Sequence, residues 1–486
     1  MFIKYIAFIS LFCICLTCYA TDCQEQVEAF CNRTSTRYAN ISILFKDLAT
    51  GDTLASYRPD NIVPTASTLK TITTATVLET YGDTFRFPTY LETDGEIKNG
   101  VLNGNLYIRG TGDPTLGSQC VGNRNFLPLW VKAIRDAGIE NINGSIVADI
   151  SLYDPAEAIP YGWTREDIGN FYAGGVFPLC YNDNTMTIFL NSGNEGTPAE
   201  IVNTDPYIPY LELENHFVCG SGRDWLVSGI PYDNHRILSG NIVPNKGRWS
   251  VKAGIPNPPL LLAQTLTSTL NSNNIRVSDA PSFTKNIDTK PRKIIYTHYS
   301  EPLNTILNET NQQSNNIYAE HLFRLLGCTS LFTNEKGQTQ CSRPKSHILI
   351  SDCIDYEKQF WFNRAVNLYP TFIYDGSGLS PQDAVSAGTL VNILAYMSKH
   401  SSYRDTWLSS LPVSGRSGTL RSFLVNTRLE GKVVAKSGTT SRVKAYCGYI
   451  YAEDGHTYVF AILVNNASVK SKVIQREIGN LLLQMF

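Results

Sequence analysis

The stretch Pro64-Thr65-Ala66-Ser67-Thr68-Leu69-Lys70 gives the strongest indication of both fold and chemistry. It leads into an expected helix from about Ser67 to Tyr81, which Gly82 closes. A spacing of three places Ser67 and Lys70 on the same helix face, about one turn apart. A serine hydroxyl is a weak nucleophile unless a base takes its proton, and a lysine of lowered pKa can be that base. Backbone N–H groups at the helix start can stabilise a developing oxyanion.

A second motif, Ser314-Asn315-Asn316, precedes the helical stretch from Ile317 to Leu326. The Ser314 hydroxyl can relay a proton to a leaving amine, and the Asn316 carboxamide can hold a substrate amide. Ser and Asn are also the residues preferred at helix N-caps, so this motif alone favours a structural interpretation.

A third motif, Lys436-Ser437-Gly438-Thr439, closes a short strand that begins at Val433. A lysine on an edge strand can attract a substrate carboxylate, and the neighbouring serine adds a hydrogen-bond donor. A glycine lets a substrate backbone pack close to the strand. Taken by itself, this motif is equally typical of a strand that ends in a turn.

Together the three motifs carry more weight than any one of them. Their order and the elements that carry them, a helix start, a loop before a helix and a strand, are those of penicillin-binding proteins and β-lactamases. Strands are expected near both chain ends, at 41–46, 53–57, 445–451 and 458–464, and a closing helix at 469–485. We therefore expect one domain built from the two ends of the chain.

The sequence resembles the D-alanyl-D-alanine carboxypeptidase/endopeptidase family, the low-molecular-mass class C penicillin-binding proteins, over nearly all of the mature chain. Besides the three motifs, the similar segments are Gly110-Thr111-Gly112-Asp113-Pro114-Thr115-Leu116, Trp163-Thr164-Arg165-Glu166-Asp167, Tyr172-Ala173-Gly174, Ala319-Glu320 and Asp375-Gly376-Ser377-Gly378-Leu379-Ser380. The long interval from Lys70 to Ser314 also fits, because this family inserts extra domains there.

The resemblance implies an α+β fold with a serine β-lactamase/transpeptidase-like catalytic domain, an antiparallel sheet flanked by helices, and large inserted, mainly β, domains. It implies action on peptidoglycan stem peptides that end in D-Ala-D-Ala, or on D-Ala cross-links, and β-lactam antibiotics as covalent inhibitors. The implied catalytic residues are Ser67 as nucleophile, Lys70 as base, Ser314 as proton donor and Asn316 as holder of the acyl-side amide.

In the same resemblance Lys436 favours the terminal carboxylate, Ser437 assists it, and Gly438 and Thr439 belong to the substrate-binding strand. The N–H groups of Ser67 and Thr439 form the oxyanion hole. Two positions depart from the family pattern: Asn315 stands where Asp is usual, and Ser437 where Thr is usual. The functional groups at the ends of the second motif and the hydroxyl of the third are retained.

Length and composition agree with a globular chain of two or three domains. The 486 residues are 43% hydrophobic and 17% charged. We expect residues 21–85 and 290–486 to form the catalytic domain and residues 86–289 to form the inserted part, with two domains. The net charge of −2 gives no reason to expect nucleic acid or an anionic membrane as partner. No metal or organic cofactor is implied.

Residues 1–20 are predicted to be an export signal, with Lys4 before the apolar run from Tyr5 to Leu16 and small residues at the cleavage site. This predicts a periplasmic or other extracytoplasmic protein, as a soluble protein or a lipoprotein, with at most peripheral membrane association. Nine cysteines remain after residue 20, and in an exported protein disulfides are their natural use. Cys23–Cys31 and Cys328–Cys341 are plausible local pairs.

Three alternatives remain open. A β-lactamase shares the acylation chemistry but adds efficient deacylation by water. A non-catalytic peptidoglycan-binding homologue would keep the fold, although all three motifs are complete. Within the enzyme interpretation, the balance between carboxypeptidase and endopeptidase activity is open. A Ser-His-Asp hydrolase and a His-Glu-x-x-His zinc peptidase are disfavoured, because neither motif occurs.

Overall fold

A computed structural model describes residues 21–122, 124–222, 224–335 and 338–486. The expected export signal lies outside these residues. The chain divides into two compact units. Unit 1 consists of the described residues up to Asp83, Leu307–Asn315 and Glu357–Phe486, and unit 2 consists of Thr84–Ile306 and Asn316–Tyr356. Residues 290–306 and 316–356, which we grouped with the catalytic domain, thus belong to unit 2, and the domain assignment itself stays a prediction.

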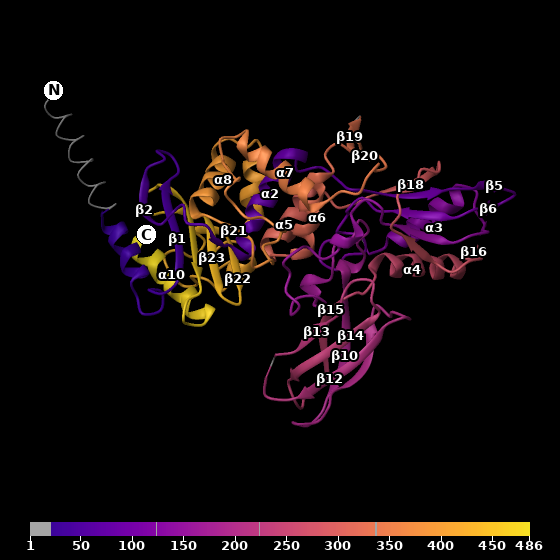
Figure 1. Cartoon of the computed structure of the whole chain (residues 1–486), viewed down its shortest axis with the longest axis horizontal. Coiled ribbons are helices and arrows are strands. Elements are labelled where there is room, and N and C mark those ends of the chain that lie inside the picture. The colour runs from indigo at the N-terminus through magenta and orange to yellow at the C-terminus, as the bar shows by residue number, and fades with distance from the viewer. Residues whose placement is uncertain (1–20, 123, 223, 336–337) are drawn as a thin grey trace. The chain divides into compact units, whose positions relative to one another are not determined.

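Unit 1 is built on one antiparallel sheet whose strands come from both ends of the chain (Figure 1). Its order is β2-β1-β24-β23-β22. The strands are β1 (Asn40–Asp47), β2 (Thr53–Tyr57), β22 (Val433–Thr440), β23 (Val443–Tyr451) and β24 (Thr457–Asn465). Because β1 pairs along its whole length with β24, strands from the two ends of the chain lie side by side in one sheet.

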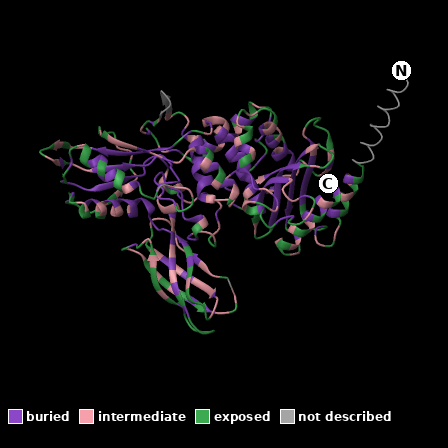
Figure 2. Cartoon of the chain, turned by 180° about the vertical axis from the view of Figure 1, so that it is seen from behind, coloured by how far each residue is buried: buried purple, intermediate pink, exposed green. Residues whose placement is uncertain are grey.

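Helices cover both faces of this sheet, and all its strands except the edge strand β2 are buried over most of their length (Figure 2). Side chains alternate along β1. Ile43 and Phe45 join a hydrophobic core with helix α10 (Ser471–Met485). Ser42 points the other way, where its Oγ accepts a hydrogen bond from the Ala387 N–H at the start of α8 (Ala387–Lys399), at 3.1 Å. A sheet buried on both sides by helices is the arrangement that the sequence predicted.

The remaining elements of unit 1 surround the sheet. They are the short pair β3 (Val63–Pro64) and β21 (Ala384–Val385), and the helices α2 (Lys70–Tyr81) and α9 (Arg404–Ser410). The chain passes from unit 2 into unit 1 within two further helices, α5 (Leu303–Gln312) and α7 (Ile350–Phe362).

Unit 2 contains a mixed sheet of order β17-β9-β7-β4-β18 and a smaller one of order β16-β8-β6-β5. They pack with helices α3 and α4 around a core that includes Trp130 and Ile108. The elements are β4 (Pro88–Thr93), β5 (Glu96–Lys98), β6 (Val101–Asn103), β7 (Leu106–Arg109), α3 (Phe126–Asp136), β8 (Asn141–Ile142), β9 (Ile146–Asp149), α4 (Pro258–Ser272), β16 (Arg276–Val277), β17 (Ser282–Thr284) and β18 (Lys293–Tyr299).

A second core in unit 2 lies between two three-stranded sheets, β11-β10-β15 and β12-β14-β13. Their strands are β10 (Thr185–Ser192), β11 (Glu200–Asp205), β12 (Glu212–Cys219), β13 (Leu226–Ser228), β14 (His235–Ile242) and β15 (Gly247–Gly254). Burial alternates along β10, as expected for sheets with one face in the core and one in solvent. Unit 2 also holds α6 (Asn316–Gly327) and the hairpin β19 (Phe332–Glu335) and β20 (Gln338–Cys341).

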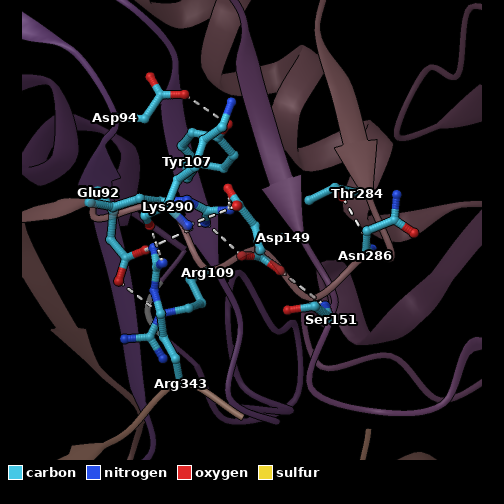
Figure 3. A network of polar contacts seen from close by, with 12 residues as sticks. Glu92, Asp94, Tyr107, Arg109, Asp149, Ser151, Thr284, Asn286, Lys290 and Arg343 are labelled. Atoms are coloured by element: carbon cyan, nitrogen blue, oxygen red, sulfur yellow. Dashed lines mark hydrogen bonds and ion pairs between the residues drawn. The ribbon is translucent and has the colours of Figure 1, made fainter. Parts of the chain in front are cut away.

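A buried ionic network crosses the mixed sheet of unit 2 (Figure 3). The Glu92 carboxylate, 2% exposed, lies 2.8 Å from Arg109 Nε, 2.9 Å from Arg343 Nη2 and 3.5 Å from Arg292 Nη1. Arg292 Nη1 also donates to Asp149 at 2.6 Å. One carboxylate thus holds three guanidinium groups that come from β7, from the loop before β18 and from the segment that follows β20.

The cysteines differ from expectation. In the part of the chain that the structure describes, neither Cys23–Cys31 nor Cys328–Cys341 is a disulfide. The Cys328 thiol instead donates to the Arg324 carbonyl at 3.3 Å, and the Cys341 thiol to the Ser342 carbonyl at 3.4 Å. Proximity in sequence therefore did not predict the state of these thiols.

Candidate active site

Ser67 lies in a short 3₁₀ turn, Ala66–Leu69, directly before α2, rather than inside the α-helix that we expected from Ser67 onward. Ala66 has a positive φ of 46°, a conformation that non-glycine residues rarely adopt. Lys70, the first residue of α2, is fully buried, and its Nζ lies 3.0 Å from Ser67 Oγ. The predicted nucleophile and base are therefore in hydrogen-bond contact.

Helix α2 contains five threonines and is buried over its first nine residues. Thr74 and Thr76 donate their hydroxyls to carbonyl oxygens four residues earlier, at 2.6 and 2.7 Å. These bonds satisfy hydroxyl groups that would otherwise be buried without partners. Gly82 ends the helix with a φ of 77°, as the sequence predicted. Tertiary burial, rather than helix propensity, therefore holds Lys70 in position.

A loop ordered by Asp375 supports Lys70 from the other side. The Asp375 carboxylate accepts backbone N–H bonds from Ser377 at 2.9 Å, Gly378 at 2.6 Å and Ser380 at 2.8 Å. The loop thereby presents the Ser377 carbonyl to Lys70 Nζ at 2.7 Å. Gly378 has a φ of 74°, and a Cβ there would lie 2.0 Å from the Ala66 carbonyl oxygen, so only glycine fits.

Lys436 and Ser314 form a second hydroxyl–amine pair in unit 1. Lys436 Nζ lies 2.8 Å from Ser314 Oγ and 2.9 Å from the Ser437 carbonyl oxygen. Burial lowers the pKa of Lys436 well below its usual range, and the positive charges of Lys70 and Lys444 lower it further. A lysine of lowered pKa that contacts a hydroxyl can exchange a proton with it, so this pair can serve as a proton relay.

The third motif runs along β22 beside the nucleophile. A Cβ on Gly438 would lie 2.6 Å from the Thr65 carbonyl oxygen and 3.1 Å from the Ser67 nitrogen, so glycine permits the close approach. Ser437 Oγ donates to Thr419 Oγ1 at 2.8 Å, and Thr439 is exposed. Unit 1 therefore brings together all the predicted site residues except Asn316.

Asn316 belongs to unit 2, where it is the first residue of α6. Its side-chain amide donates to the Tyr172 carbonyl oxygen at 3.2 Å, and Tyr172 lies in one of the segments that carried the family resemblance.

Sequence reasoning missed Lys444 and Thr419, and it quoted the Asp375 segment without assigning it a role in the site. Lys444 lies directly opposite Thr439 across the β22–β23 hairpin, and its Nζ is 2.8 Å from Thr439 Oγ1. The two-residue connection from Thr440 to Val443 fixes that register. The short connection between the strands would therefore have predicted the pairing of Lys444 with Thr439, but we expected the second strand to begin only at Ala445.

Within the ranges that the structure describes, no three His, Cys, Asp or Glu side chains are grouped so that they could hold a metal ion. In the same ranges, no helix combines the length and the apolar character needed to cross a bilayer.

Known proteins resemble this chain over most of its length. Residues 23–484 match the model of the D-Ala-D-Ala carboxypeptidase 3 (S13) family. The chain is 26% identical over 471 residues to the D-alanyl-D-alanine carboxypeptidase of Actinomadura sp. strain R39, covering 92% of this chain and 82% of the relative.

Solved structures share the fold. Penicillin binding protein 4 (dacB) from Haemophilus influenzae superposes with a TM-score of 0.79 at 20% identity, over 95% of this chain and 98% of that one. A predatory endopeptidase from Bdellovibrio bacteriovorus, solved with an immunity protein, gives a TM-score of 0.50 at 16% identity, over 92% and 93% of the two chains. The expected fold class is thus confirmed.

Proposed function

Because the chain belongs to the D-Ala-D-Ala carboxypeptidase 3 (S13) family, we propose that it is a serine-type hydrolase that releases the terminal D-Ala from peptidoglycan stem peptides. The observation that carries this proposal is the contact between the buried Lys70 Nζ and Ser67 Oγ at 3.0 Å. An ordinary surface Ser-x-x-Lys would leave its lysine in water, whereas here burial holds the amine on the hydroxyl.

Acylation begins when Ser67 Oγ attacks the carbonyl carbon of the penultimate D-Ala while Lys70 Nζ takes the hydroxyl proton. The N–H groups of Ser67 and Thr439 stabilise the oxyanion of the tetrahedral intermediate. The C–N bond then breaks, and Ser314 Oγ donates a proton to the departing D-Ala amine. The proton that Lys70 took from Ser67 passes to Lys436, which returns it to Ser314 across their 2.8 Å contact, so that no side chain ends the step with a proton gained or lost. Asn316 holds the acyl-side amide of the substrate.

Deacylation completes the reaction. Water attacks the ester that joins Ser67 to the peptide, the C–O bond breaks, and the Ser67 hydroxyl is regenerated with a proton from the attacking water. The same acyl-enzyme accounts for inhibition by β-lactams, whose ring-opened product remains on the serine. The name of the similar Haemophilus influenzae protein, a penicillin binding protein, supports this extension.

Endopeptidase activity on D-Ala cross-links uses the same steps with a larger leaving amine, so we retain it as a second activity of this site. The name of the Bdellovibrio bacteriovorus protein supports that activity. We also propose that the chain acts outside the cytoplasm, where peptidoglycan lies, because residues 1–20 have the pattern of an export signal.

Labelled penicillin tests the proposal. The mature protein is incubated with it and the adduct is located by peptide mass spectrometry. We expect one stable acyl group on Ser67, absent in Ser67→Ala, and release of D-Ala from an acylated peptide ending in D-Ala-D-Ala. Rapid release of hydrolysed penicillin would instead favour a β-lactamase. A folded protein with neither adduct nor turnover would favour a non-catalytic homologue and overturn the proposal.

A further inference from the structure

Lys444 places a positive charge beside the substrate-binding strand. Among the residues that the structure describes, no ion pair includes Lys444 or Lys436. Lys444 is 8% exposed, and its Nζ donates to Thr439 Oγ1 at 2.8 Å. Its ammonium also lies 5.0 Å from the centre of the Tyr446 ring. A largely buried cation usually has a negative partner, so the absence of one here points to a ligand.

Lys436 is less suited to bind an anion directly. It is fully buried, and its Nζ already contacts Ser314 Oγ and the Ser437 carbonyl oxygen. Lys444 differs because the atom it contacts belongs to Thr439, which is exposed at the end of β22. Burial lowers the pKa of Lys444 only to about 8, so its amine is mostly protonated at neutral pH.

The position of Thr439 relates this cation to the substrate. In the proposed reaction its N–H group binds the oxyanion of the scissile carbonyl. The carboxylate of the terminal D-Ala is three bonds from that carbonyl carbon, within about 4 Å by standard bond lengths. The carboxylate therefore falls within the reach of the two groups beside that N–H, the Thr439 hydroxyl and the Lys444 ammonium.

We propose that Lys444 is the residue that recognises the C-terminal carboxylate of the substrate, acting together with the Thr439 hydroxyl. This inference rests on the proposed function and assigns to Lys444 the role that the family resemblance gave to Lys436. Lys436 then serves the proton relay through Ser314, and Lys444 makes the enzyme selective for peptides with a free terminal carboxylate.

The test compares two substrates that differ only in that carboxylate: an acylated peptide ending in D-Ala-D-Ala and its C-terminal amide. Lys444→Met removes the charge and keeps most of the side-chain volume. We expect kcat/KM for the acid to fall about 10- to 100-fold, the range of a charge-assisted hydrogen bond, and kcat/KM for the amide to change less than about threefold. Lys444→Arg should keep the preference for the acid, and Lys472→Met, at an exposed lysine of α10, should behave as wild type.

Two controls separate this inference from the proposed function. Stoichiometric labelling of Ser67 at saturating penicillin shows that each variant has a folded site. If the wild type is labelled but cleaves neither peptide, acylation rates with penicillin and with its methyl ester replace the peptide pair, with the same selectivity expected.

Equal losses on acid and amide, or no loss on either, would overturn the assignment of Lys444 while leaving the proposed function intact. A folded wild type that is neither labelled nor active would overturn both.

Discussion

The Glu92 network makes a quantitative prediction about unit 2. Glu92→Gln removes the negative charge that faces Arg109, Arg292 and Arg343 but keeps the shape of the side chain. Loss of one partner from a buried ion pair costs about 3–5 kcal/mol, because an uncompensated charge remains buried. Asp149 still faces Arg292, so we expect the lower end, about 3 kcal/mol. For a unit of this size that lowers the melting temperature by roughly 6–12 °C.

The assay is chemical denaturation combined with hydrogen exchange of peptides that cover β4 and β7. Exchange is needed because two units can unfold separately, so a single global transition is not assured. Glu96→Gln is the matched control, since Glu96 is an exposed carboxylate on the neighbouring β5. We expect faster exchange in β4 and β7 only for Glu92→Gln.

A double variant sharpens the test. Adding Arg109→Met to Glu92→Gln removes one of the buried guanidinium groups that have lost their carboxylate partner. If this unpaired buried charge is what destabilises Glu92→Gln, the double variant should regain at least about 1 kcal/mol of the lost stability. The reasoning is refuted if Glu92→Gln is no less stable than Glu96→Gln, or if the double variant is less stable than the two single losses added together.

Two further predictions concern unit 1. Burial raises the pKa of Glu357 to about 8, above its value in the unfolded chain. Between roughly pH 5 and 8 the native state therefore holds a proton that the unfolded state has lost. In this range each unit of increase in pH lowers the free energy of unfolding by up to about 1.4 kcal/mol. Glu357→Gln should remove this slope in denaturation curves measured from pH 5 to 8, whereas parallel curves for variant and wild type would contradict the assignment. Asp375→Ala removes the acceptor of three N–H groups in the loop that contacts Lys70, so we expect acylation of Ser67 by penicillin to slow at least about tenfold while its final stoichiometry is kept. An unchanged acylation rate would show that the loop does not position Lys70.

The sequence predicted much of unit 1 because the local patterns for strands, turns and motifs agree with the strand pairing that forms over long distances in sequence. The strands at both ends alternate, tight turns join them, and the three motifs mark the helix start, the loop and the strand. The 3₁₀ turn at Ser67 was not predicted, because it depends on the positive φ of Ala66 and on Gly378 packed against it. Neither constraint is visible in a local pattern, since Gly378 lies some 300 residues away in sequence.

The predictions that failed elsewhere, and the contacts that were missed, also depend on neighbours that a local sequence pattern does not reveal. The two expected disulfides were inferred from short spacing, but a thiol can satisfy its hydrogen-bond needs with a nearby carbonyl, as Cys328 does with Arg324. The ionic network of unit 2 joins Glu92 to Arg343, which are too far apart in sequence for any charge pattern to link them. Lys444 was missed because the strand start was placed two residues too late, at Ala445 instead of Val443, which hid its pairing with Thr439.

The pairing of β1 with β24 has a consequence for how the protein is made. Asn40 pairs with Asn465, so β1 waits for more than 400 further residues before its partner leaves the ribosome. At about 5–20 residues per second that delay is of the order of 20–80 s. Unit 2 is encoded entirely within that interval, so it can complete its fold while the edge of β1 is still exposed. A transcript cut short before β24 would encode Ser67 and Lys70 yet lack the central strand that joins β1 to β23 in their sheet.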